Sequence, residues 1–243
     1  MENRCTFTFA HYEEMLKTGK DAGYVFMTCY SYSLLQKTIT SSTQPLCVLR
    51  HDVDYSPQRS IRLAEIENKL GIQSTFFFRT HANEYNPLGY EVVSLIKDLD
   101  QMGHEIGLHV EPLDIERGAK VNPESSIRLG KHVLEEILGH PIVGMASHND
   151  PTPDNNLRFF DHKSSKNFGL MYEAYDQDGL DLFARSTYVT DSYFWHWRTF
   201  EKGKLTDRQE CLCHHFEQRQ SSLLYCLTHP HCWYETHYHR VLY

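Results

Sequence analysis

Short apolar runs alternate with amphipathic segments along most of this chain, and this alternation restricts its fold more than any other feature. The apolar runs have the length of buried strands, whereas the segments between them have apolar residues at helical spacing and end at glycines. Strands separated by helices predict β-α-β units and a parallel sheet, that is, an α/β fold. We expect helices at 57–70, 90–102 and 124–138, a first helix from Phe9 to Gly19 or Gly23, and strands at 24–27, 47–50, 74–79, 105–109, 142–146 and 223–227.

The length and charge of the chain limit its class. A chain of 243 residues suits one α/β domain with its own core, and we expect a single domain over residues 1–243. Its net charge of -8 argues against nucleic acid or an anionic membrane as the main partner. No apolar stretch approaches the about 20 residues of a membrane span, and residues 1–5 lack the pattern of a secretory signal. We therefore expect a cytoplasmic protein with reduced cysteines.

Carboxylates and imidazoles follow four of the predicted strands. Asp52 and Asp54 follow the strand at 47–50, His109 ends the strand at 105–109, and His148 and His229 follow the strands at 142–146 and 223–227. The carboxyl ends of parallel strands lie at one edge of a sheet, so these side chains should converge. Two carboxylates can divide the tasks of binding a cation and accepting a proton from water, and imidazole is a natural zinc ligand.

Each motif alone also has a structural explanation. Asp52 and Asp54 fit a turn and capping cluster, with Ser56 as the helix cap and Pro57 at the first helical position. A lone histidine is usually a hydrogen-bonded rim or core residue, and we expect this of His104, which begins its strand. The convergence of all four strand ends favours a functional site.

A second cluster of potential ligands comprises Cys211, Cys213, His214 and His215. Its tight spacing lacks the second ligand pair of a structural zinc site. We therefore favour ordinary buried residues here over a metal site.

Four segments together resemble a known family. Leu49-Arg50-His51-Asp52-Val53-Asp54 and Gly103-His104-Glu105-Ile106-Gly107-Leu108-His109 resemble the Thr-Phe-Asp-Asp-Gly and Gly-His-Glu-Ile-Gly-Asn-His-Ser/Thr-x-x-His motifs of the polysaccharide deacetylase superfamily, which includes carbohydrate esterase family four. Leu227-Thr228-His229-Pro230 with Trp233 resembles the closing motif, and Thr190-Asp191-Ser192 with Trp195 or Trp197 resembles the segment before it. The resemblance covers residues 45–235 approximately.

The resemblance implies a distorted (β/α) barrel and hydrolysis of an amide, in most members the N-acetyl group of an amino sugar. It makes Asp52 the general base and His229 the general acid. Asp54 and His109 would hold one divalent metal ion, expected to be zinc. The substrate-binding residues that we expect are Arg50, Asp191 and Trp233.

The match to the family fails at one ligand. The second metal histidine of the family would lie four residues after His109, where this chain has Leu113. We expect His148 to complete the site from the next strand, with Glu111 and Asp114 as alternatives.

Three functions follow from this pattern. The first is a carbohydrate N-deacetylase acting on an amino-sugar glycan or its precursor, as in surface-polysaccharide biosynthesis. The second is hydrolysis of a small non-sugar amide, and the third is glycan binding by a pseudoenzyme. The presence of Asp52 and His229 favours an enzyme, because binding alone needs neither a base nor an acid.

Overall fold

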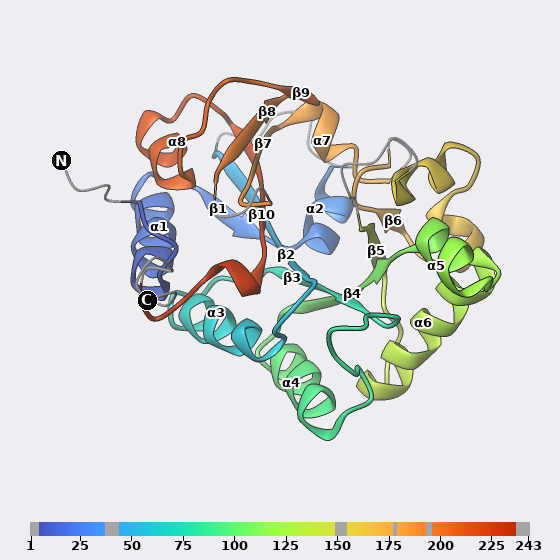
Figure 1. Cartoon of the computed structure of the whole chain (residues 1–243). Coiled ribbons are helices and arrows are strands. Elements are labelled where there is room, and N and C mark those ends of the chain that lie inside the picture. Colours follow the sequence, from blue (N-terminus) through green and yellow to red (C-terminus); the bar gives the residue numbers. More distant parts are fainter. Residues whose placement is uncertain (1–4, 37–43, 149–154, 177–178, 193–195, 237–243) are drawn as a thin grey trace.

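The computed structural model describes residues 5–36, 44–148, 155–176, 179–192 and 196–236, and every statement below concerns these residues (Figure 1). They form one ten-stranded sheet. Its strands are β1 (Val25–Met27), β2 (Leu46–Val53), β3 (Thr75–Arg79), β4 (Glu105–Val110), β5 (Gly144–Ser147), β6 (Tyr172–Glu173), β7 (Thr187–Thr190), β8 (Arg198–Glu201), β9 (Lys204–Leu205) and β10 (Leu223–Thr228).

The strand order is β6-β5-β4-β3-β2-β10-β7-β8-β9. All pairs are parallel except the hairpin of β7, β8 and β9. The first half of β2 pairs with β1, and its second half pairs with β3 on the same edge. The predicted α/β class and parallel sheet are therefore confirmed.

Helices cover the convex side of the sheet. In Figure 1, α1, α3, α4 and α6 lie outside the strands, and α8, α1, α3, α4, α6 and α5 pack in succession. The helices are α1 (Phe9–Asp21), α2 (Cys29–Leu35), α3 (Gln58–Lys69), α4 (Tyr90–Gln101), α5 (Pro112–Ala119), α6 (Pro123–Leu138), α7 (Leu182–Arg185) and α8 (Leu212–Gln218), with 3-10 helices η1 (Asn156–Asp161), η2 (Ser165–Phe168) and η3 (Pro230–Cys232). None of the described helices is both long and apolar enough to cross a bilayer.

Local sequence explains the ends of most helices. The side chain of Asn122 accepts a hydrogen bond from the Ser125 amide at the start of α6, and Gly139 ends that helix at a φ of +77°. The predicted cap of α3 was wrong: Ser56 has a φ of +49°, and the helix begins at Gln58 without a side-chain cap. The cause is the sharp turn between β2 and α3, which places Ser56 outside the extended conformation that a capping residue needs.

The sheet is strongly curved. Its concave side holds one apolar cluster with residues from β2, β3, β5, β6, β7, β10 and α2. The hydroxyl of Tyr175, next to β6 at one end of the strand order, lies 3.2 Å from that of Tyr188 on β7. This curvature agrees with the predicted distorted barrel.

A buried polar network lies on the convex side, between β2 and α3. Glu67 of α3 has no exposed surface, and its carboxylate lies 2.8 Å from His51 Nε2 and accepts hydrogen bonds from Tyr12 and Ser74. His104 is buried, with Nδ1 3.5 Å from Glu67 Oε2. As expected, His104 has a structural place.

Candidate metal centre and active site

The candidate residues share one face of the sheet because side chains alternate along a strand. On β2, Cys47 and Leu49 pack into a convex-side cluster, whereas Val48 packs into the concave one. The same two-residue period places Arg50 and Asp52 on the concave face, and Asp54 continues it beyond the end of the strand. The predicted convergence at the carboxyl ends of the strands is therefore observed.

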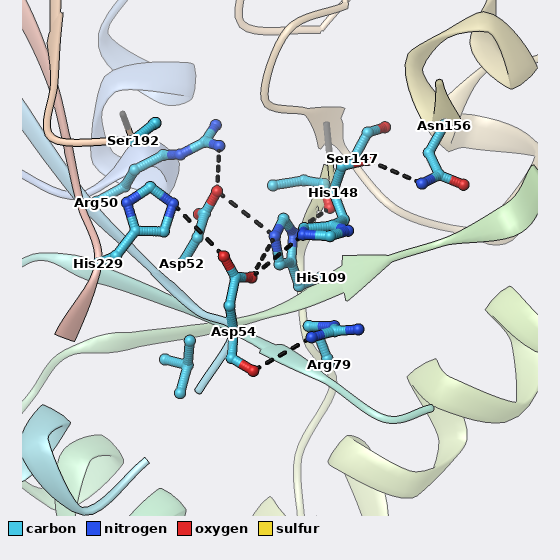
Figure 2. A network of polar contacts seen from close by, with 12 residues as sticks. Arg50, Asp52, Asp54, Arg79, His109, Ser147, His148, Asn156, Ser192 and His229 are labelled. Carbon is cyan, nitrogen blue, oxygen red and sulfur yellow. Dashed lines mark hydrogen bonds and ion pairs between the residues drawn. The ribbon is translucent and has the colours of Figure 1, made fainter. Parts of the chain in front are cut away.

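Asp54, His109 and His148 form a compact group. One ligand atom of each lies within 4.8 Å of the other two. Asp54 Oδ1 lies 3.3 Å from His109 Nε2 and 3.8 Å from His148 Nε2. Figure 2 shows the Asp54 carboxylate between these two rings on one side and His229 on the other. The structure thus brings together the three residues that were predicted to hold a metal.

His109 has the orientation of a metal ligand. Its Nδ1 lies 2.8 Å from the Ala146 carbonyl oxygen, which can only accept, so Nδ1 carries the proton. Nε2 is the nitrogen that faces Asp54 Oδ1, and in the neutral ring it is the one free to ligate a metal. Metal-binding histidines are commonly fixed in this way by a partner on the second nitrogen.

The charge around Asp54 favours its ionised form. Burial alone would raise the pKa of Asp54, but the contact with His109 and the nearby rings of His229 and His148 lower it well below its usual range. Asp54 Oδ1 is buried and has no hydrogen-bond partner. A cation between Asp54, His109 and His148 would satisfy this oxygen, so the donors fit a divalent ion of the zinc class.

Glu111 and Arg79 support His148. Glu111 Oε1 lies 3.2 Å from His148 Nδ1 and 2.7 Å from Arg79 Nη2, while Arg79 Nη1 donates to the Asp54 carbonyl oxygen at 3.2 Å. Glu111 was predicted only as an alternative ligand, and Arg79 was not predicted. The one available signal was that Arg79 ends β3, between the strands that carry Asp54 and His109.

Asp114 is the remaining alternative ligand. It forms a separate group with Glu111 and His148, without Asp54 or His109, and its Oδ2 accepts a hydrogen bond from Asn156 at 2.7 Å. Both carboxylates thus have other partners, and His148 is the better placed third donor.

Asp52 is buried beside this group. Its Oδ2 accepts a hydrogen bond from Arg50 Nη2 at 2.7 Å and lies 3.6 Å from His109 Nε2. Its Oδ1 has no partner. The carboxylate is therefore held by one oxygen and can accept a proton on the other.

His229 lies on the opposite side of Asp54, with Nε2 3.6 Å from Asp54 Oδ2. Its Nδ1 lies 2.6 Å from Asp191 Oδ1, and Asp191 Oδ2 accepts hydrogen bonds from the His229 amide and from Trp233 Nε1. Burial would lower the pKa of His229, but the charge and hydrogen bond of Asp191 raise it to about 9. His229 is thus protonated at neutral pH, and its Nε2 can donate a proton.

The three residues predicted to bind substrate, Arg50, Asp191 and Trp233, have no exposed surface in this structure. Arg50 donates a hydrogen bond to Asp52. Trp233 donates one to Asp191, and Asp191 in turn contacts the ring of His229. Trp197 packs 6.2 Å from the Trp233 ring, and Trp195 lies outside the described residues.

No protein-family model and no curated protein matches this chain. Solved structures with a similar fold include the Streptococcus pyogenes deacetylase PplD in complex with acetate, with 17% identity, 64% of this chain and 70% of that chain covered, and a TM-score of 0.49. IcaB from Ammonifex degensii has 18% identity, coverage of 60% and 68%, and a TM-score of 0.44. BA3943, a CE4 family pseudoenzyme from Bacillus anthracis, has 14% identity, coverage of 78% and 56%, and a TM-score of 0.45.

Proposed function

We propose that this chain is a metal-dependent amide hydrolase of the polysaccharide deacetylase superfamily, and that it removes the N-acetyl group from an amino-sugar glycan or its precursor. One observation carries the proposal: Asp54, His109 and His148 converge, with Asp52 Oδ2 3.6 Å from His109 Nε2 and His229 Nε2 3.6 Å from Asp54 Oδ2. This arrangement supports the proposal of a base, a cation site and an acid within one group of side chains.

The residues divide the reaction among them. A divalent ion held by Asp54, His109 and His148 would supply Lewis-acid chemistry for a carbonyl oxygen and a water. Asp52 Oδ1 accepts the proton of the attacking water, whose oxygen joins the carbonyl carbon. His229 Nε2 gives its proton to the leaving nitrogen as the carbon–nitrogen bond breaks, which yields acetate and a free amine.

Two buried residues keep the acid and the base in position. Arg50 fixes Asp52 through one oxygen, and Asp191 keeps His229 protonated. Amide hydrolysis needs such a pair, because an amide nitrogen is a poor leaving group unless it is protonated.

The test measures acetate release from N-acetylglucosamine oligomers by metal-stripped protein with and without added zinc. We expect activity only with zinc, and we expect Asp52→Asn to lower turnover by ~10²–10⁴-fold while it keeps the metal. Asp54→Asn should lose much of the metal. Asp98→Asn on the exposed side of α4 is the matched control. A folded, zinc-loaded Asp52→Asn variant with near-normal turnover would rule out the assigned base.

A further inference from the structure

A second group of metal-ligating side chains lies away from the candidate active site. Cys5, His11, Cys211 and Cys213 come from the segment before α1, from the first turn of α1, and from the start of α8. In Figure 1, α1 and α8 lie side by side at the edge of the molecule. Cys5 and His11, about 200 residues earlier in the chain, therefore supply the second ligand pair that the Cys211–Cys213 segment lacks.

We propose that Cys5, His11, Cys211 and Cys213 form a structural zinc site. One donor atom of each lies within 4.8 Å of all the others. Cys5 Sγ lies 3.5 Å from Cys213 Sγ, and His11 Nε2 lies 3.3 Å from Cys211 Sγ. Zinc bonds of about 2.3 Å to sulfur and about 2.0 Å to nitrogen give tetrahedral edges of roughly 3.5–3.8 Å, close to these separations.

The histidine is oriented as a ligand. His11 Nδ1 lies 3.2 Å from the carboxylate of Glu14, which can only accept a hydrogen bond from it, and Nε2 faces the Cys211 sulfur at 3.3 Å. A carboxylate behind a ligating imidazole is a common support for zinc. His214 Nε2 lies 3.5 Å from Cys5 Sγ, but its ring is outside the four-residue group.

The site is closed. Cys211, Cys213 and His11 are buried, and Cys5 is half-buried. The three cysteines and the histidine would fill all four coordination positions of a tetrahedral zinc ion. No position would stay open for a substrate, as is typical of a structural Cys3His site. The 3.5 Å between Cys5 and Cys213 is also far longer than the about 2.05 Å of a disulfide. On binding, the thiols lose their protons to solvent and ligate as thiolates.

The site would tie the segment before α1 to the start of α8. Phe7, between Cys5 and α1, packs 5.3 Å from the Trp233 ring, and Trp233 donates to Asp191. The four ligands would therefore fix the segment that contains Phe7. This segment packs against Trp233, which contacts Asp191, the partner of His229.

The experiment adds cobalt(II) to metal-free, reduced, full-length protein. We expect one equivalent to give a near-ultraviolet thiolate-to-cobalt charge-transfer band with intense tetrahedral visible bands, and excess zinc to abolish both. Asp54→Asn should keep these bands, since its site has only oxygen and nitrogen donors. Cys213→Ser and Cys5→Ser should weaken or lose the charge-transfer band, whereas Cys29→Ser, at a buried cysteine of α2, should keep it.

Three results would overturn the site. They are no charge-transfer band in the reduced wild-type protein, an unchanged band in both Cys5→Ser and Cys213→Ser, or a Cys5–Cys213 disulfide in protein purified without oxygen. If a serine variant does not fold, His11→Cys gives a second test, because four sulfur donors should keep a tetrahedral spectrum with stronger charge transfer. If the protein shows these bands but releases no acetate, the proposed deacetylase function is contradicted and the proposed zinc site is not.

Discussion

At the scale of single residues, the proposed acid, His229, depends on one buried carboxylate. Asp191 has no exposed surface, and it contacts both the ring and the amide of His229. Its negative charge offsets the burial that would otherwise favour the neutral imidazole. The raised pKa of His229 therefore depends on its contact with Asp191.

We expect Asp191→Asn to lower turnover by about 10–100-fold, the usual effect of losing a supporting partner. The amide keeps the size of the side chain but not its charge, so the pKa of His229 falls from about 9. Less imidazolium is then present as the pH rises, and the alkaline limb of the pH–rate profile should move to lower pH. Asp98→Asn is the control, and a profile that does not move would contradict the role of Asp191.

The third ligand can be tested at His148. We expect His148→Ala to weaken zinc binding in competition with a chelator by about 10–100-fold or more, while the fold is kept. His132→Ala, at an exposed histidine of α6, is the control. Unchanged affinity would move the assignment to Glu111 or Asp114.

At the scale of elements, Glu67 joins α3 to its neighbours. Its carboxylate is contacted from α1 by Tyr12, from β2 by His51 and by Ser74 just before β3. Burial would raise the pKa of Glu67, but His51, His104 and Ser74 lower it below its ordinary 4.5. A lowered pKa means that this stabilisation is complete above about pH 4.5 and is lost as the pH falls through the folded-state value.

Replacing the carboxylate tests this link. We expect Glu67→Gln to lower the free energy of unfolding by about 3 kcal/mol at neutral pH, because an amide cannot accept from all three donors. The free energy of unfolding should also fall less steeply as the pH is lowered below about 4.5. Urea unfolding at neutral and acidic pH measures both, with Glu65→Gln, half-exposed on the same helix, as control. An equally steep acid limb in Glu67→Gln would contradict this account.

Elements with local signals were predictable from the sequence. The run before Asp52 and the caps of α6 depend on neighbouring residues, so β2 and α6 were placed within a few positions. The contact of His11 with Cys211 and that of Arg79 with Glu111 join residues far apart in the chain. Only the topology makes these pairs neighbours, which is why the sequence could not indicate them.

At the scale of the whole molecule, the two ends of the described chain are joined by backbone. Phe9 N donates to the Tyr234 carbonyl oxygen at 2.9 Å, and Tyr234 N donates to the Phe7 carbonyl oxygen at 3.1 Å. The proposed zinc site lies next to this pairing.

Loss of the zinc ligands should therefore loosen this junction first. In Cys5→Ser, we expect faster hydrogen exchange at the amides of Phe9 and Tyr234, with unchanged protection in the central strands. Cys29→Ser should behave like the wild type. Exchange that rises equally throughout the sheet would indicate global destabilisation instead.

The central position of β10 has a consequence for synthesis on the ribosome. Among the described strands β10 comes last in the chain, yet it lies between β2 and β7 and separates them. Until residues 223–228 leave the exit tunnel, β2 has an open edge and β7 has no parallel partner. While the nascent chain still lacks β10, it carries Asp52 and Asp54 but not His229, so the proposed acid joins the proposed base only once β10 has been made.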